Sequence, residues 1–112
     1  MRVIVCGGRA YDDYEGLERT LDGLHERHRF TLLIHGACYG ADRFAGKWAT
    51  ARGIPVESVP ANWKRFGKQA GPHRNAEMLT RKPDLVIAFP GGKGTADMVN
   101  KARKAGVEVK SI

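Results

Sequence analysis

The sequence predicts a single α/β domain: a Rossmann-like, three-layer arrangement in which helices cover both faces of a parallel five-stranded sheet. Three observations support this fold class. Short apolar runs alternate with segments of helical periodicity along the whole chain. Three of the five apolar runs are followed by glycine. The length of 112 residues suits one domain, residues 1–112, with no second core.

Five short runs carry the strand pattern, because they are rich in apolar residues and bounded by turn residues. They cover residues 2–6, 31–35, 54–59, 84–89 and 107–110. The first, second and fourth runs are continuously apolar, so we expect them in the centre of the sheet, buried on both faces. Pro55 and the alternating pattern at the last run favour edge positions for the other two. The Rossmann-like strand order 3-2-1-4-5 satisfies these placements.

Helical periodicity separates the strands, with apolar residues recurring at steps of three and four. These segments are residues 14–28, 41–49, about 73–81, and a last one that follows the glycine turn of residues 90–95 and ends at about residue 105. Gly53 and Gly106 are the expected stops of the second and last helices. The polar stretch from Pro60 to Gly71 is expected to form a loop.

Charge and composition narrow the classes of function. The chain carries 19 Lys and Arg against 12 Asp and Glu, a net charge of +7 that favours phosphates or nucleic acid as partners. No run approaches the roughly 18 apolar residues that cross a bilayer, and the N-terminus lacks a signal pattern. We therefore expect a cytoplasmic protein without a membrane partner. Cys6 and Cys38 lack the spacing of a zinc site, so no metal is expected.

Three glycine turns are expected at one edge of the sheet, because parallel strands all end there and ligands collect there. They are Gly7-Gly8-Arg9, Gly36 to Gly40, and Pro90 to Thr95. Glycine lets an anion approach the backbone amides, and a helix N-terminus attracts a phosphate. Each turn alone is explained as well by the steric need for glycine in a tight strand-to-helix turn as by an anion site. Together, in a basic chain, they predict an anion site.

The third turn, Pro90-Gly91-Gly92-Lys93-Gly94-Thr95, carries the prediction furthest. It has three glycines in four positions, and its threonine hydroxyl can cap the helix or bond a phosphate oxygen. It lacks the spacing of a Walker P-loop, so ATP hydrolysis is not implied.

Three side chains near these turns admit two interpretations each. Asp42 either compensates the helix dipole or accepts a hydrogen bond from a ribose hydroxyl or a base edge. Arg9 is either an exposed surface residue or a phosphate clamp, and its place favours the clamp. Trp63 either packs a long loop or stacks on a base, and we favour stacking.

The chain resembles the SLOG superfamily over nearly its whole length, and most closely the YspA-type, cpYpsA-related branch. Four motifs carry the resemblance: Gly7-Gly8-Arg9-Ala10-Tyr11, His35-Gly36-Ala37-x-x-Gly40-Ala41-Asp42, Ala70-Gly71-Pro72-x-Arg74-Asn75-x-x-Met78, and Ala88-Phe89-Pro90-Gly91-Gly92-Lys93-Gly94-Thr95. Relatives in the superfamily include the Lonely Guy phosphoribohydrolases and DNA-processing protein A. The resemblance implies a Rossmann-like domain that binds a nucleotide-derived ligand.

Phosphoribohydrolases of the superfamily carry P-G-G-x-G-T-x-x-E, whose glutamate works with an upstream arginine on the N-glycosidic bond. The resemblance assigns that arginine to Arg74, whereas Met98 stands where the glutamate belongs. Asp97 is not an obvious substitute, because one residue rotates a helical side chain by about 100°. Cleavage needs a carboxylate, so Asp42 or Glu77 would have to supply it.

The leading hypothesis is binding, for sensing or processing, of a nucleotide-derived, phosphate-bearing ligand; no cofactor is firmly implied. The expected ligand-binding residues are Gly7, Gly8, Arg9, Gly36, Gly40, Asp42, Trp63, Arg74, Asn75, Pro90, Gly91, Gly92, Lys93, Gly94 and Thr95. An N-glycosidase using Arg74 with Asp42 or Glu77 is one alternative. Single-stranded nucleic-acid binding through the basic loop near Lys64 and Arg65 is another, ranked lower. A homodimer is compatible with the resemblance.

Overall fold

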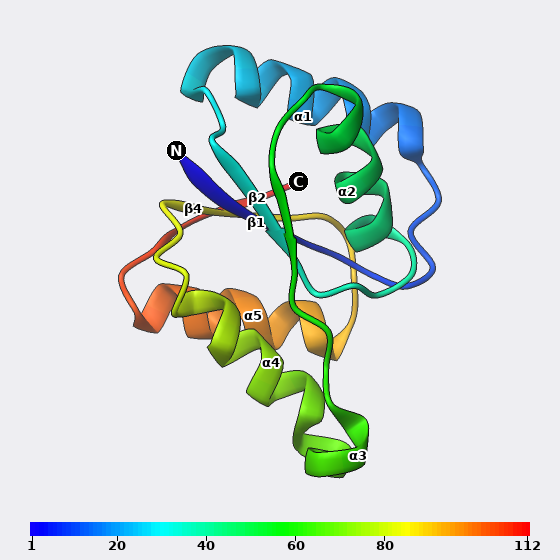
Figure 1. Ribbon diagram of the computed structural model, residues 1–112, viewed down its shortest axis with the longest axis vertical. Helices are drawn as coiled ribbons and strands as arrows, with labels where there is room; N and C mark the ends of the chain where they lie inside the picture. The colour runs from blue at the N-terminus through cyan, green and yellow to red at the C-terminus, as the bar shows by residue number, and fades with distance from the viewer.

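The computed structural model describes residues 1–112 and shows the predicted α/β fold with a five-stranded, all-parallel sheet (Figure 1). The strands are β1 (Arg2–Cys6), β2 (Leu32–His35), β3 (Val56–Ser58), β4 (Leu85–Ala88) and β5 (Glu108–Ser111). Their order is β3-β2-β1-β4-β5, which confirms the predicted arrangement. β1, β2 and β4 occupy the centre, where side chains on both faces are buried.

Two helices cover each face of the sheet (Figure 1). The pair α1 (Tyr14–His28) and α2 (Ala41–Ala51) lies on one face, and α4 (Ala70–Leu79) lies with α5 (Lys93–Lys104) on the other. None of these helices is long and apolar enough to span a bilayer.

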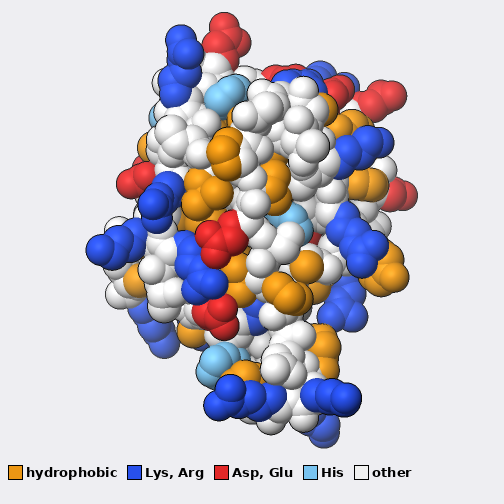
Figure 2. Space-filling view, in the orientation of Figure 1, with side chains coloured by type: hydrophobic (Ala, Val, Ile, Leu, Met, Phe, Trp, Pro, Cys, Tyr) orange, Lys and Arg blue, Asp and Glu red, His pale blue; other side chains and the backbone are white.

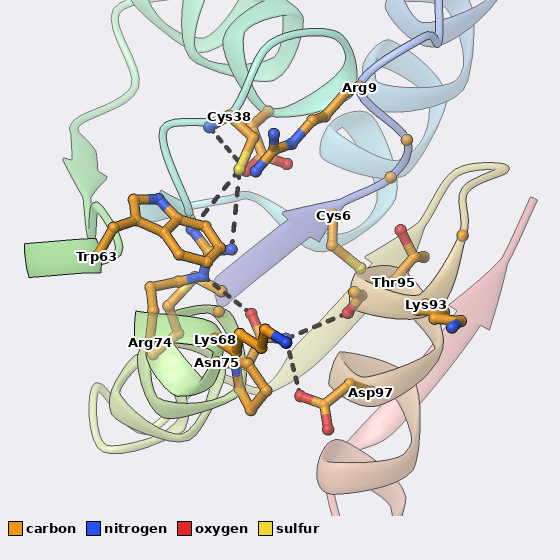
Figure 3. A pocket seen from close by; sticks show the side chains of 18 residues that line it. Cys6, Arg9, Cys38, Trp63, Lys68, Arg74, Asn75, Lys93, Thr95 and Asp97 are labelled. Atoms are coloured by element: carbon orange, nitrogen blue, oxygen red, sulfur yellow. Dashed lines mark hydrogen bonds between the residues drawn. The ribbon is translucent and has the colours of Figure 1, made fainter. Parts of the chain in front are cut away.

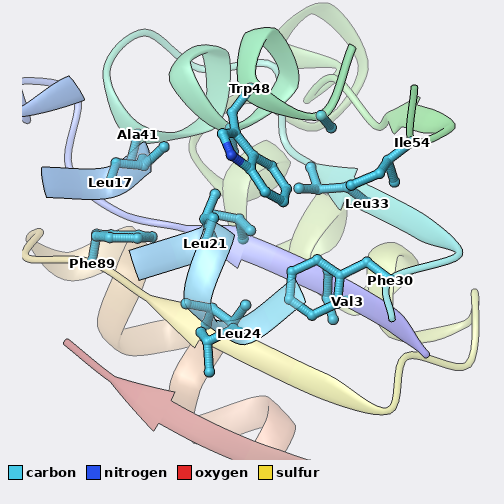
Figure 4. Packing of buried hydrophobic residues seen from close by; sticks show 14 of the residues in the cluster. Val3, Leu17, Leu21, Leu24, Phe30, Leu33, Ala41, Trp48, Ile54 and Phe89 are labelled. Carbon is cyan, nitrogen blue, oxygen red and sulfur yellow. The ribbon is translucent and has the colours of Figure 1, made fainter. Parts of the chain in front are cut away.

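Alternation along β1 divides the core into two clusters, since successive strand residues face opposite sides of a sheet. Val3 and Val5 pack with Trp48 and the leucines of α1 (Figure 4). Ile4 and Cys6 face the second cluster, under α4 and α5. β1 therefore contributes side chains to both clusters, as does β4.

The segment expected as a loop contains additional helical structure. A short helix, α3 (Trp63–Phe66), precedes a 3-10 turn, η1 (Gly67–Gln69), and α4 starts at Ala70 rather than at about His73. The Asn62 side chain caps α3 by accepting a hydrogen bond from the Arg65 amide at 3.1 Å. Asn62 directly precedes a run without proline, residues 63–71, and this capping residue was the signal that the loop interpretation overlooked.

The three glycine turns pack directly against one another around Gly8. The Gly8 amide donates to the Pro90 carbonyl at 2.9 Å, and the Ala41 amide donates to the Gly8 carbonyl at 3.3 Å. A Cβ on Gly91 would lie 2.7 Å from the Gly8 nitrogen, and a Cβ on Gly40 would strike the Gly8 carbonyl oxygen. The glycines at these positions therefore allow backbone-on-backbone contact at the carboxyl edge of the sheet.

This contact predicts different costs for two alanine substitutions at positive φ. Gly40 and Gly53 have φ of 77° and 72°, but only Gly40 has backbone atoms where a Cβ would go. Gly53→Ala should cost about 1 kcal/mol of unfolding free energy from backbone strain alone. Gly40→Ala should cost about 1–3 kcal/mol more, because the turns must separate. Urea denaturation measures both, and equal losses would contradict direct packing of the turns.

Candidate functional site

A cavity of about 560 Å³ opens at the carboxyl edge of the sheet, a volume suited to a small molecule. Its walls come from the turns after β1 and β2, from the α3–α4 segment and from the start of α5. Figure 3 shows Trp63 and Arg74 on one side, Thr95 and Asp97 on the other, and Cys6 at the end of β1 between them.

Most of the residues expected to bind a ligand line this cavity. They are Gly7, Gly8, Arg9, Asp42, Trp63, Arg74, Asn75, Gly92, Lys93, Gly94 and Thr95. Gly36 and Gly40 do not line it, but their backbones lie behind its wall, against Arg74 and Gly8 respectively. Pro90 and Gly91 border a separate, shallower depression.

The structure does not bring Glu77 to the cavity. Its side chain lies on the outer face of α4, where its carboxylate pairs with Arg81 one turn later at 3.1 Å.

The first turn of α5 offers unsatisfied amides to the cavity. Lys93, Gly94 and Thr95 have no acceptor for their backbone N–H groups, and no side chain caps the helix. A Cβ on Gly92 or Gly94 would meet no atom within 4 Å, so the protein's own packing does not require glycine there. Free amides, the positive end of a helix and open space together make an anion site.

Arg74 is a buried cation without a carboxylate partner. Its side chain is 9% exposed, and the ion pairs of the chain involve other residues. One terminal nitrogen donates to the Gly36 carbonyl, Nε donates to Asn75 Oδ1 at 3.0 Å, and both terminal nitrogens lie 3.7 Å from Cys38 Sγ. A Cβ on Gly36 would strike the guanidinium, so glycine is needed where Arg74 crosses the end of β2.

Asn75 joins the guanidinium to the start of α5. While its Oδ1 accepts from Arg74, its Nδ2 donates to the Gly94 carbonyl at 3.1 Å and to Asp97 Oδ2 at 3.0 Å. A single amide side chain therefore sets the position of the buried cation relative to the anion site.

Asp97 faces the cavity, contrary to the expectation from its position beside Met98. Met98 is fully buried in the second core cluster, and this orientation turns Asp97 toward the cavity. Burial acts to raise the pKa of Asp97, but hydrogen bonds from Lys101 and Asn75 outweigh it and hold the pKa below its usual value. Met98 and Ala102 are one helical turn apart and mark the buried face of α5. This apolar periodicity was the sequence signal that Met98 lies in the core and that Asp97 does not.

Asp42 organises the turn after β2. One of its oxygens, Oδ2, accepts hydrogen bonds from the Gly36 amide at 3.0 Å and the Cys38 amide at 3.3 Å. The side chain is 5% exposed. Burial raises the pKa of Asp42 to about 6, against the opposing effect of these hydrogen bonds and of Arg74.

Arg9 and Trp63 lie at the rim of the cavity. The Arg9 guanidinium is 6.0 Å from the Trp63 ring centroid, and the indole is 52% exposed (Figure 3). Lys68 also lines the cavity. Beyond the rim, Figure 2 shows Lys and Arg side chains gathered at the end of the molecule where α3 lies, which includes the exposed Lys64 and Arg65.

Several lining residues were not singled out from the sequence as site residues. They are Cys6, Cys38, Gly71, Pro72, Met78 and Asp97; Lys68, which also lines the cavity, was named only for the nucleic-acid alternative, with Lys64 and Arg65. Four of these residues lie within the four motifs or at their variable positions: Cys38, Gly71, Pro72 and Met78. Their closeness in the sequence to the motif residues was a signal that they belong to the site. No group of three or more His, Cys, Asp or Glu side chains is placed to hold a metal ion.

Comparison with known proteins agrees with the fold and with the family resemblance. Gene 61 protein of Mycobacterium phage D29 is 34% identical over 116 residues, covering 96% of this chain and 93% of that protein. DNA processing protein A from Streptococcus pneumoniae has a similar structure, with a TM-score of 0.56 and 17% identity over 97% of this chain. The match covers 58% of that structure, so this chain spans somewhat over half its length.

The family comparison covers the first two glycine turns. Residues 1–66 match the family described as the YspA, cpYpsA-related SLOG family. This is more than half of the chain, and the phage protein extends the likeness over nearly all of it. The chain therefore belongs to the YspA, cpYpsA-related SLOG family.

Proposed function

We propose that this protein binds a nucleotide-derived, phosphate-bearing ligand in the cavity at the carboxyl edge of the sheet. The observation that carries the proposal is the pairing of two anion-binding elements in one cavity. The start of α5 presents three unsatisfied amides, and Arg74 presents a buried guanidinium with no carboxylate partner. A phosphate supplies the hydrogen-bond acceptor that the amides lack and the negatively charged partner that Arg74 lacks.

The charge around the cavity supports a ligand with more than one negative charge. Four cations that form no ion pair line it: Arg9, Lys68, Arg74 and Lys93. Only two carboxylates line it, and Lys101 already pairs with that of Asp97. The exposed indole of Trp63, close to Arg9, offers a face on which a planar base could stack.

Substitution of Gly94 tests the phosphate site, because its Cβ would enter open space. Gly94→Glu should lower the affinity for the tightest-binding phosphate ligand at least about tenfold, since a carboxylate repels the phosphate. Its thermal midpoint should not fall, because an acidic side chain suits a helix N-terminus. Gly94→Gln is the control of the same size as Gly94→Glu but without its charge, and it should lose distinctly less affinity for the ligand.

Calorimetry against nucleoside mono- and diphosphates, ADP-ribose and NAD supplies the ligand for this comparison. If none of them binds, or if Glu and Gln at position 94 act alike, the phosphate site is not at α5. Tight binding of a single-stranded oligonucleotide, weakening steeply with salt, would instead favour the nucleic-acid interpretation.

A second candidate function, hydrolysis of an N-glycosidic bond, is favoured by the position of Asp97. Positive charge develops on the sugar as the carbon–nitrogen bond breaks, and a carboxylate of low pKa stabilises it. Asp97 lines the cavity, and its pKa is held below the usual value. In this reaction water adds its hydroxyl to the sugar carbon, and the base leaves with the proton.

Asp97→Asn tests the hydrolase function while keeping an oxygen for Asn75. Release of free base from a nucleoside monophosphate should fall about a hundredfold or more, with ligand affinity changed far less. Glu77→Gln is the matched control on an exposed helix face and should leave base release unchanged. Chromatographic detection of the base measures both; absence of base release by the unmodified protein at high concentration refutes hydrolysis and leaves binding intact.

A further inference from the structure

Asp42 keeps one carboxylate oxygen free of any hydrogen bond. Oδ2 accepts from the amides of Gly36 and Cys38, whereas Oδ1 has no partner in the chain. No side-chain nitrogen or oxygen that is fully enclosed lacks a partner, so Oδ1 is accessible. Asp42 is only 5% exposed and lines the cavity, and we infer that Oδ1 opens there.

This free oxygen makes the two ends of the cavity chemically different. At the α5 end, amides without acceptors need an anion. At the Asp42 end, a carboxylate oxygen without a donor repels an anion and needs a hydroxyl or N–H group. Asp42 is held by amides that follow β2, α5 follows β4, and β1 lies between these strands. The two ends therefore lie on either side of β1 and face the same cavity.

A ligand that fills both ends must carry an anion and a hydrogen-bond donor on one small molecule. A pentose phosphate has this combination. The hydroxyls of a sugar are donors on the same short spacer that carries the phosphate, whereas a base N–H would have to turn inward from the rim near Trp63.

We propose that Asp42 Oδ1 accepts a hydrogen bond from a hydroxyl of the ligand's sugar, so that Asp42 selects ligands that join a phosphate to a hydrogen-bond donor. This inference rests on the proposed function and names the part of the ligand that lies opposite the phosphate.

Asp42 should also make binding depend on pH. The ionisable groups that face it are Arg74 from α4, Arg9 from the turn after β1, Cys6 at the end of β1 and Cys38 beside it. Burial raises the pKa of Cys6 to about 12, so that thiol stays neutral. The pKa of Asp42 is about 6, and a protonated carboxyl group is a poorer acceptor. The sugar contact should therefore weaken as the pH falls through about 6.

Asp42→Asn isolates this contact. The amide oxygen of asparagine can accept from Gly36 and Cys38 as Oδ2 does, so its NH₂ replaces the free oxygen and an acceptor becomes a donor. Each ribonucleoside 5′-monophosphate and its 2′,3′-dideoxy form would be titrated by calorimetry from pH 5 to 8. For the ribonucleotides, Asp42→Asn should lose about tenfold or more in affinity above pH 7, as expected when a buried polar contact is removed.

The dideoxy ligands act as the matched control. They should bind the unmodified protein as weakly as ribonucleotides bind Asp42→Asn, and this arm needs no variant. The second ionisation of the phosphate also lies near pH 6, so pH dependence that remains in Asp42→Asn belongs to the phosphate. The additional dependence of the unmodified protein belongs to Asp42.

Three results would overturn the inference in different ways. If dideoxy and ribonucleotide ligands bind equally and Asp42→Asn changes neither affinity nor pH dependence, Asp42 binds no donor, although loss of binding in Gly94→Glu would still support the phosphate site. If no phosphate ligand binds either protein, both proposals fail. Equal binding of the two ligand series combined with a loss in Asp42→Asn also overturns the sugar contact, because the donor to Asp42 then belongs to the base.

Discussion

The packing of three glycine turns around the backbone of Gly8 is the contact on which the candidate site depends. Gly8 bonds to the turn before α5 on one side and to the start of α2 on the other. No Cβ fits at Gly40 or Gly91, so the turns approach to backbone contact. This proximity brings the amides of α5, the Asp42 turn and the Arg9 rim into one cavity. With larger residues the same strands could form, but their ends would be held apart.

A buried guanidinium is expensive to desolvate unless its donors are satisfied. In this protein a backbone carbonyl, an amide side chain and a thiol contact Arg74, and no carboxylate lies within ion-pair distance of it. Its positive charge acts to lower the pKa of Asp42, and under the proposed function it also attracts the ligand's phosphate. Because Asn75 binds both Arg74 and the first turn of α5, a ligand on either element is positioned relative to the other.

The two carboxylates in the cavity have opposite surroundings. Asp97 receives hydrogen bonds from Lys101 and Asn75, which keep it ionised. Asp42 is more deeply buried, receives two backbone amides on one oxygen only, and has its pKa raised. Groups whose environments separate their pKa values in this way can take different roles. Asp97 suits stabilisation of positive charge, and Asp42 suits recognition of a donor.

The sequence by itself determined the fold class and the strand order, because these depend on apolar periodicity. It placed a glycine turn after β4 from local steric need, but α5 begins at Lys93, inside the turn expected at residues 90–95. It also pointed to most residues that line the cavity, since the ends of parallel strands meet at one edge. Only the tertiary structure decided which carboxylates reach the cavity. Glu77 lies outside it and Asp97 within it, because burial of Met98 in the core sets the rotation of α5. The free oxygen of Asp42 likewise depends on which amides the fold brings to its partner oxygen, a matter of three-dimensional distance rather than residue order.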